Sequence, residues 1–340
     1  MKRLFISQEN LKILIRDLKK SCDEFIAPKR EHLEDIIFGD AKQDNRELLN
    51  YKGNSIISPR EFLLPRTEII FEIKSAKENR MIPREDRKKR VFYGVRPCDI
   101  AALVLMRKFF LEGFADILYR QKLDNSIFIS LACNERCSNL AFCNQIDSGP
   151  IAKAGFDLQL LPLDSGFLVE AGTNKGKQII SRNKKLFLRA TALQEKEPKA
   201  KLKDFPGEAK IDYKKLAKIM QADKIKTSVW EDIGTRCVVC SGCITLCPTC
   251  SCFSIADRLR NDKGVRMRYC DGCPYAGFTR MAGGATPFPE HKDHIRRFFE
   301  HKLNVDVQRY KRPSCVGCAR CIRTCPGNIS IYKFIQEALK

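Results

Sequence analysis

The chain has 340 residues, 44% of them hydrophobic and 30% charged, which is long enough for two or three domains with a sizeable core. Its formal net charge is +21 and it contains 17 cysteines. The longest apolar stretch, residues 101–106, is too short to span a bilayer, and the charged N-terminal region lacks the apolar segment of a secretory signal. We therefore expect a cytoplasmic protein whose cysteines bind metal, because the cytosol keeps thiols reduced and disfavours disulfides.

The first predicted element is an amphipathic helix over residues 7–22. Its apolar residues recur with helical spacing, at Leu11, Leu14, Ile15 and Leu18. Ser7 stands where an N-cap residue is expected. Cys22 lies at the end of this helix, and we interpret it as a packing residue.

A β–α–β pattern follows further along the chain. Residues 69–73 alternate in the way of a strand, residues 91–95 form a second strand and residues 127–132 a third. Asp99 can cap a helix over roughly residues 100–112. Because a helical crossover between neighbouring strands makes them parallel, the pattern predicts an α/β (α+β) domain over residues 1–193.

Four cysteines follow two of these strands directly. Cys98 comes after residues 91–95, and Cys133, Cys137 and Cys143 come after residues 127–132. The carboxyl ends of parallel strands meet at one edge of the sheet, where ligands bind. These cysteines could therefore surround a further iron–sulfur cluster or a zinc ion, with Asp99 as an alternative ligand. The other interpretation is that they are free cysteines without metal.

Residues 194–210 are rich in Lys and Glu and contain Pro198, Pro206 and Gly207, which predicts an exposed linker. A helix near residues 212–222 then leads into a second domain over residues 211–340.

The most informative pattern of this second domain occurs twice, as C-x2-C-x2-C-x3-C-P. The first copy is Cys237, Cys240, Cys243 and Cys247, and the second is Cys315, Cys318, Cys321 and Cys325. This is the spacing of bacterial ferredoxins, in which the fourth cysteine of each copy binds the other [4Fe–4S] cluster. Structural zinc also uses paired C-x2-C, but it requires neither the third cysteine nor the proline.

The spacing predicts two ligand sets. Cluster I would be bound by Cys237, Cys240, Cys243 and Cys325, and cluster II by Cys315, Cys318, Cys321 and Cys247. The expected fold of residues 211–340 is a mainly helical, ferredoxin-like domain for two clusters. The 68 positions between Cys247 and Cys315 exceed what a minimal ferredoxin needs, which predicts an insertion between the motifs.

The predicted insertion contains four more cysteines, Cys250, Cys252, Cys270 and Cys273. A C-x-C and a C-x2-C pair together make a complete quartet for another iron–sulfur cluster or zinc. Packing against the neighbouring clusters is the alternative.

Other motifs have little support. Residues 172–177 resemble a phosphate-binding loop but are one residue short and lack its Ser or Thr, and no G-x-G-x-x-G follows a strand. No nucleic-acid-binding motif is present. Each cluster with four thiolates carries about two or three negative charges, so two clusters lower the net charge to roughly +17 and four to roughly +13. The remaining basic surface is either simply solvated or suited to acidic partners such as small ferredoxins.

With these residues in view, nearly the whole chain resembles one family of iron–sulfur electron-transfer subunits, which serve anaerobic sulfite reductase and, as the beta subunit, soluble [NiFe] sulfhydrogenases. The resemblance depends on Trp230 and on segments spread along the chain, at residues 62–68 (FLLPRTE), 94–100 (GVRPCDI), 141–143 (AFC), 247–253 (CPTCSCF), 271–273 (DGC), 281–284 (MAGG) and 315–321 (CVGCARC). Three positions depart from the family pattern. Ala141 replaces a cysteine, Cys270 an aromatic residue and Ala285 a histidine.

The resemblance implies a subunit of a multisubunit oxidoreductase without an active site of its own. It would relay single electrons between a subunit that binds flavin and NAD(P)H, or a ferredoxin, and a catalytic subunit such as a [NiFe] hydrogenase or sulfite reductase. A second hypothesis is a self-contained, flavin-dependent iron–sulfur reductase with flavin or substrate in the N-terminal domain. A third, a metal-stabilised nucleic-acid-binding protein, has no motif behind it, and we expect neither nucleic acid nor membrane as a partner.

Overall fold

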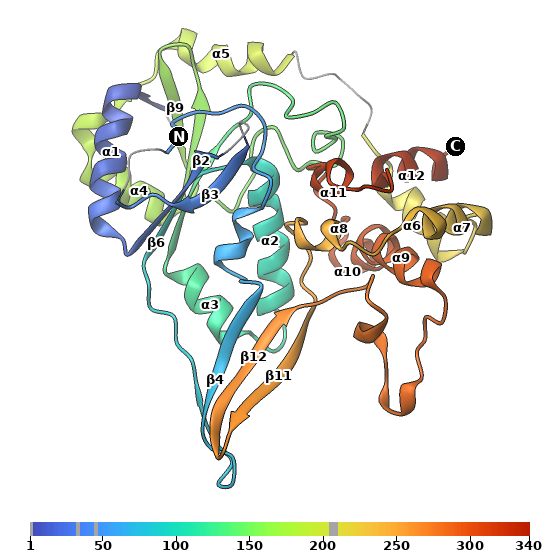
Figure 1. Ribbon diagram of the computed structural model, residues 1–340. Helices are drawn as coiled ribbons and strands as arrows, with labels where there is room; N and C mark the ends of the chain where they lie inside the picture. Colours follow the sequence, from blue (N-terminus) through green and yellow to red (C-terminus); the bar gives the residue numbers. More distant parts are fainter. Residues whose placement is uncertain (1–2, 32–34, 44–46, 204–209) are drawn as a thin grey trace. The chain divides into compact units, whose positions relative to one another are not determined.

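The computed structural model describes residues 3–31, 35–43, 47–203 and 210–340 (Figure 1). They divide into two compact units. The first unit comprises Met1–Leu63 and Asp86–Ala209, and the second comprises Leu64–Glu85 and Lys210–Lys340. This differs from the predicted boundaries, because a segment from the N-terminal part of the sequence belongs to the second unit.

The described part of the first unit contains an eight-stranded sheet in the order β10-β1-β9-β8-β7-β6-β2-β3. Its strands are β1 (Leu4–Ser7), β2 (Glu24–Arg30), β3 (Ile36–Asp40), β6 (Arg90–Val95), β7 (Ser126–Leu131), β8 (Leu158–Pro162), β9 (Gly166–Ala171) and β10 (Leu188–Arg189). The central strands β2, β6, β7 and β8 are parallel, and the outer pairs are antiparallel. The predicted parallel pairing of residues 91–95 with residues 127–132 is therefore confirmed.

Helices cover both faces of this sheet (Figure 1). On one face, α1 (Gln8–Ser21) and α4 (Asn174–Arg182) pack against alternate residues of the central strands in one large core that also buries Cys22. On the other face, Phe92 and Phe128 stack with ring centroids 4.9 Å apart, close to α2 (Pro97–Leu111). Helix α3 (Ile117–Asp124) packs against α2. Burial on both faces is typical of strands in a parallel sheet.

Helix α1 forms as its sequence predicts. The Ser7 hydroxyl accepts a hydrogen bond from the Asn10 backbone N–H at 3.2 Å, which caps the first turn. The four predicted apolar residues, Leu11, Leu14, Ile15 and Leu18, are all buried. The amphipathic pattern therefore directs one face of the helix into the core.

The predicted linker begins as a helix, α5 (Ala192–Lys203), and residues 204–209 lie outside the described part of the chain. The Thr191 hydroxyl accepts from the Gln194 N–H at 3.3 Å, and the Gln194 side chain accepts from the Thr191 N–H at 3.0 Å. This reciprocal arrangement is a capping box, which marks a helix start. Lys and Glu also favour helix, so the composition that suggested a linker is equally consistent with this one.

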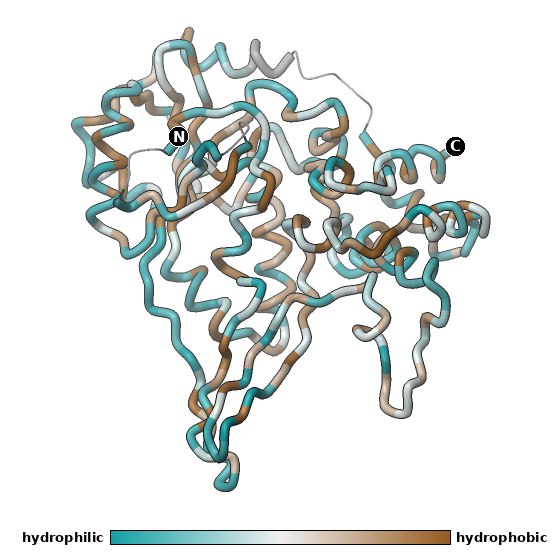
Figure 2. Tube along the Cα trace, in the orientation of Figure 1, coloured by the Kyte–Doolittle hydropathy of each residue, from teal (hydrophilic) through white to brown (hydrophobic). Residues whose placement is uncertain are grey.

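The described part of the second unit contains a four-stranded antiparallel sheet in the order β11-β12-β4-β5. The strands are β4 (Thr67–Ser75), β5 (Arg80–Pro83), β11 (Phe253–Arg260) and β12 (Lys263–Cys270). The hairpin β11–β12 lies in the predicted insertion and pairs with β4, a strand expected in the first domain. Buried Arg268 of β12 donates to Glu68 of β4 at 2.8 Å, which holds the distant segments together. Figure 2 shows hydrophobic and hydrophilic residues mixed along these strands.

The remainder of the second unit is helical, so it contains both a sheet and helices. The main helices are α6 (Tyr213–Gln221), α7 (Thr227–Arg236), α8 (Gly242–Thr245), α9 (His291–Glu300), α10 (Asp306–Tyr310), α11 (Arg320–Arg323) and α12 (Ile331–Ala338). Between α9 and α10 lies a π-helical turn, His301–Val305. Trp230 of α7, Phe299 of α9 and Phe334 of α12 pack together, with ring centroids 4.8–6.0 Å apart. This aromatic contact fixes the helices around the first cysteine motif.

Candidate metal centres

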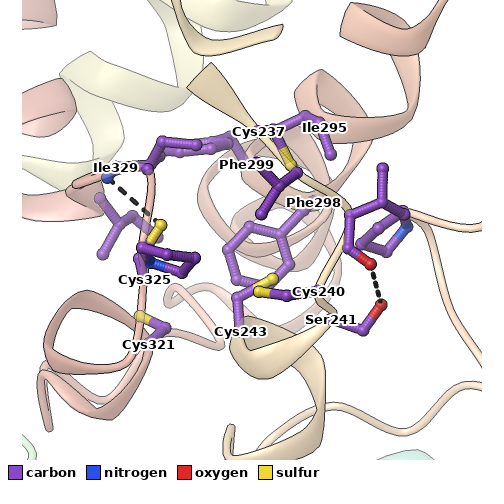
Figure 3. Close-up of a pocket in the computed structure, with 16 residues that line it drawn as sticks. Cys237, Cys240, Ser241, Cys243, Ile295, Phe298, Phe299, Cys321, Cys325 and Ile329 are labelled. Carbon is purple, nitrogen blue, oxygen red and sulfur yellow. Dashed lines mark hydrogen bonds between the residues drawn. The ribbon is translucent and has the colours of Figure 1, made fainter. Parts of the chain in front are cut away.

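The first cysteine motif lies around a pocket of the second unit (Figure 3). The four predicted ligands of cluster I all line it, at Cys237, Cys240, Cys243 and Cys325. Cys321, assigned to the other cluster, lies at the same pocket. Hydrophobic residues also line this pocket, at Ile295, Phe298, Phe299, Ile329 and Ile331. The pocket thus combines sulfur ligands with an apolar wall.

Both motifs adopt the same uncommon backbone conformation. In the first copy, Val239 and Ser241 are left-handed, with φ of 53° and 59°. In the second copy, Gly317 and Ala319 occupy the equivalent positions with φ of 63° and 61°. A non-glycine residue in this region costs on the order of 1–3 kcal/mol, and a β-branched valine is rarely found there. The repetition of this strained shape in both copies points to a common function.

This conformation directs backbone N–H groups toward sulfur. The Gly317 N–H donates to Cys315 Sγ at 3.5 Å, and the Val239 N–H is bonded to Cys237 in the same way. At the fourth cysteine of the second motif, the Ile329 N–H donates to Cys325 Sγ at 3.4 Å. Such hydrogen bonds stabilise thiolates and the cluster that they bind.

The second ligand set is more deeply buried. Cys315 and Cys318 are 9% and 8% exposed. Cys247, which the spacing assigns to this cluster, is close enough to Cys315 and Cys321 to affect the pKa of both. The short helices α8 and α11, which follow the two loops, are in contact. Each fourth cysteine follows one of these two helices. Contact between the helices therefore supports the prediction that each fourth cysteine binds the cluster of the other motif.

Burial makes these thiols poor ligands unless a cation is present. It raises the pKa of Cys315 to about 12, and burial together with the neighbouring thiolates raises the pKa of Cys243 to about 12. At neutral pH these groups would be protonated in the metal-free chain. Iron binding deprotonates them and offsets the cost of burying their charge.

A [4Fe–4S] cube and a single metal ion need different arrangements of their ligands. A zinc ion needs four ligand atoms converging at one point, whereas a [4Fe–4S] cube binds each cysteine through a different iron and so needs sulfurs spread around a cavity. In the described ranges, no three His, Cys, Asp or Glu side chains are grouped closely enough to bind one ion. The side chains of Cys237, Cys240, Cys243 and Cys325 lie around the first pocket (Figure 3).

Comparison with known proteins agrees with this interpretation. Residues 236–329 match the family described as a 4Fe-4S dicluster domain. The chain is also 28% identical over 294 residues to the sulfhydrogenase 2 subunit beta of Pyrococcus furiosus, covering 83% of each protein. These two findings support the predicted similarity of this chain to iron–sulfur beta subunits. The predicted resemblance is thereby confirmed, and the chain is an iron–sulfur electron-transfer subunit similar to a hydrogenase beta subunit.

No helix in the described part of this chain is long and apolar enough to cross a membrane.

Three cysteines of the predicted insertion come together in a second, smaller pocket. Cys250, Cys252 and Cys273 line it, beside Lys302. Cys252 and Cys273 are hydrogen-bonded to each other, and this bond lowers the pKa of Cys273 to about 7 and raises that of Cys252. Cys270 is not among the residues that line this pocket; it ends β12, where its N–H donates to the Arg66 carbonyl at 2.7 Å. The structure therefore groups three of the four predicted residues.

The cysteines of the first unit lie where the sheet topology predicts, after the carboxyl ends of β6 and β7. Cys98 is buried in the first turn of α2, and Cys133 is beside the Arg96 guanidinium. Cys137 is near enough to influence the same guanidinium. Cys143 lies in the loop after β7 against Gly149. Their role as metal ligands stays a prediction.

Sequence reasoning overlooked one residue of this region, Lys302. It is 4% exposed and lies among the buried cysteines. A signal was present, because Lys302 continues the helical spacing of Ile295, Phe298 and Phe299, which places it on a buried face. A lysine on an apolar face needs a partner, and here the sulfurs provide it.

Proposed function

We propose that this chain relays single electrons through two [4Fe–4S] clusters inside a multisubunit oxidoreductase. Cluster I is bound by Cys237, Cys240, Cys243 and Cys325, and cluster II by Cys315, Cys318, Cys321 and Cys247. The observation that carries the proposal is the pair of cysteine loops with identical left-handed positions, one of them enclosing a pocket. Each cluster, when bound, would accept and release one electron.

The two ligand sets are near enough for transfer between them. Cys321 of the second set also lines the pocket of the first, and Cys243 of the first set influences the pKa of Cys321. Helices α8 and α11 meet so closely that a Cβ on Gly242 would lie 3.0 Å from the Thr324 methyl group. This contact supports the proposal that both sites lie within the same group of helices.

The two sites differ in access to solvent, which supports different positions for the two clusters along the relay. Cys240 is exposed and Val238 beside it is 65% exposed, whereas Val316 in the equivalent position is 2% exposed. We propose that partners exchange electrons at cluster I and that cluster II is the interior station.

The partners that we propose are a reductase subunit binding flavin and NAD(P)H, and a catalytic subunit. The similar protein is named as a subunit of a sulfhydrogenase, which supports an assembly of this kind. The net charge of +21 remains positive after the charge of two clusters is subtracted, which favours acidic docking surfaces such as that of a small ferredoxin.

Further metal sites are part of the proposal. Cys250, Cys252 and Cys273, with Cys270 as a fourth candidate, would bind one more cluster or a zinc ion. Cys98, Cys133, Cys137 and Cys143 would bind another. Each group adjoins a positive side chain, Lys302 and Arg96 respectively, which is suited to a site with several thiolates.

One observation favours a second candidate, a self-contained flavin-dependent reductase. A polar pocket in the first unit is lined by Arg30, Lys52 and Arg96 together with Tyr51, Cys133 and Glu135, which pairs with Lys52. Three cations near the carboxyl end of the sheet would suit an anionic flavin phosphate or substrate. Anaerobic protein that releases a yellow flavin on denaturation, or reduces a dye with NAD(P)H without partners, would support this candidate over the relay.

The relay is tested by purifying the full chain without oxygen and measuring iron, sulfide and the EPR spectrum after dithionite reduction. We expect at least about eight irons per chain and reducible signals of [4Fe–4S] clusters. Cys22→Ala is the matched control, because Cys22 is buried in the first unit, away from both motifs in sequence, and this variant should retain all the iron. Natively folded protein without iron would contradict the proposal.

A further inference from the structure

Lys302 lies in the π-helical turn that links α9 to α10 and is 4% exposed. Its Nζ donates to Thr249 Oγ1 at 3.0 Å and lies 5.3 Å from the centre of the Phe298 ring. Its backbone carbonyl accepts from the Ser314 N–H at 3.1 Å, directly before Cys315. Both ends of the residue are therefore fixed to segments that carry cluster II ligands. π-Helical turns are found frequently at functional sites.

Thr249 connects the ammonium to a ligand sulfur. Its Oγ1 is 3.3 Å from Cys247 Sγ. An ammonium group can only donate, so Thr249 accepts from Lys302 and its own hydroxyl proton is free to point at the sulfur. The chain of contacts thus runs from a positive charge through a hydroxyl group to Cys247.

The charge of Lys302 has no carboxylate partner: none of the ion pairs among the described residues includes it. Burying an isolated ammonium costs several kcal/mol, so a negative group must compensate it. The ligand thiolates of cluster II, which carry negative charge when the cluster is bound, would do so, because Lys302 Nζ reaches Cys247 through Thr249.

Cluster I has no equivalent arrangement. Both motifs end in Cys-Pro, and the position after the proline is Thr249 in one and Gly327 in the other. Gly327 has no side chain, and a Cβ there would lie 2.2 Å from the Arg236 carbonyl oxygen. Among the described residues, no charged side chain lines the cluster I pocket. Of the two motif sites in the described part of the chain, cluster II is therefore the one with a buried ammonium group connected to its ligands.

We propose that Lys302, acting through Thr249, raises the reduction potential of cluster II above that of cluster I. Reduction adds one electron and one negative charge to a group that is already anionic, so a buried cation stabilises the reduced form. No proton is transferred. The inference rests on the proposed function, because it requires both clusters, and it makes cluster II the electron acceptor of the pair.

The test is an EPR-monitored redox titration of the iron-loaded full chain. We expect two midpoints, with that of cluster II higher. Cys240→Ser, in the exposed loop, identifies the cluster I step because that step should disappear or change its spectrum. Lys302→Met should lower the cluster II midpoint toward that of cluster I and leave cluster I less affected. Lys302→Arg, which keeps the charge, should retain most of the difference.

Thr249→Val separates tuning from a merely structural role. It keeps Lys302 and removes the hydroxyl group, so the cluster II midpoint should fall by a smaller amount. If Lys302→Met does not retain iron, Thr249→Val still tests the inference, because this variant keeps the lysine. Lys214→Met removes a charge at an exposed position of α6 and should change neither midpoint.

Unchanged midpoints in Lys302→Met and Thr249→Val, or equal shifts of both clusters, would overturn the inference while leaving the relay intact. Absence of reducible clusters in the unmodified chain would instead overturn the proposed function.

Discussion

The two cysteine loops share one backbone conformation but lie in different surroundings. Residues 237–243 and 315–321 repeat the same left-handed positions and the same N–H bond to the first sulfur. The first loop has an exposed cysteine and an apolar pocket, whereas the second is buried and has Lys302 and Thr249 close to its ligand set. The ligand spacing therefore determines the shape of the loop, and the surrounding residues give each site its own properties.

The largest contrast should come from removing one ligand of each loop. Cys318→Ala and Cys240→Ala should each lose about four irons per chain. Cys318→Ala should also lower the melting temperature more, because Cys318 lies in the buried loop, where unligated sulfurs and disrupted packing cannot be relieved by solvent. Iron analysis and anaerobic thermal unfolding measure both effects. Full iron retention in both variants would show that these residues are not ligands.

A second comparison concerns two glycines near the fourth cysteines. A Cβ on Gly327 would lie 2.2 Å from the backbone oxygen of Arg236, the residue before Cys237. Gly327→Ala should therefore force the two halves of site I apart and cost about 3 kcal/mol or more. Gly242→Ala places its Cβ 3.0 Å from the Thr324 methyl, a side chain that can rotate, and should cost less.

Denaturant unfolding of the iron-loaded variants, with the loss of cluster absorbance as the signal, measures this pair. Equal stability of the two glycine variants would contradict the close backbone contact at site I.

Two substitutions at the equivalent left-handed positions should change the stability of the loops in opposite directions. Gly317→Val places a β-branched residue at φ of 63° and should destabilise the second loop by about 1–3 kcal/mol. Val239→Gly relieves the same strain at φ of 53° and should stabilise the first loop by about 1 kcal/mol, since glycine also loses more entropy on folding. The rate of cluster loss in guanidinium checks both. A destabilised Val239→Gly variant would mean that the valine side chain contributes packing that outweighs its strain.

Much of this architecture was predictable because it depends on local patterns. Helical spacing and Ser7 predict α1, alternation predicts β6 and β7, and the position of cysteines after those strands predicts that they share a sheet edge. The repeated C-x2-C-x2-C-x3-C-P predicts both loops, since ligand geometry leaves the backbone few alternatives.

What could not be predicted depends on long-range contacts. β4 alternates like any strand, and its sequence does not say that its partner is β12, about 200 positions later. Lys302 is one of many basic residues, and its burial depends on the Thr249 hydroxyl and the sulfurs nearby. Helix α5, in contrast, had a local signal in its sequence. The capping box at Thr191 and Gln194 indicates a helix start, but Pro198, Pro206 and Gly207 favoured the prediction of a linker.

The smallest expected effect comes from the valines that follow the first cysteine of each motif. Val316 is 2% exposed and Val238 is 65% exposed, although both occupy the same position of the loop. Val316→Ala removes buried methyl groups and should cost about 1–3 kcal/mol, whereas Val238→Ala should change the stability by less than about 0.5 kcal/mol. Anaerobic denaturant titrations of the two variants give this difference directly. If Val238→Ala proves as costly as Val316→Ala, the exposed loop must be covered in the protein in solution, and cluster I would lose its proposed role as the point of exchange with partners.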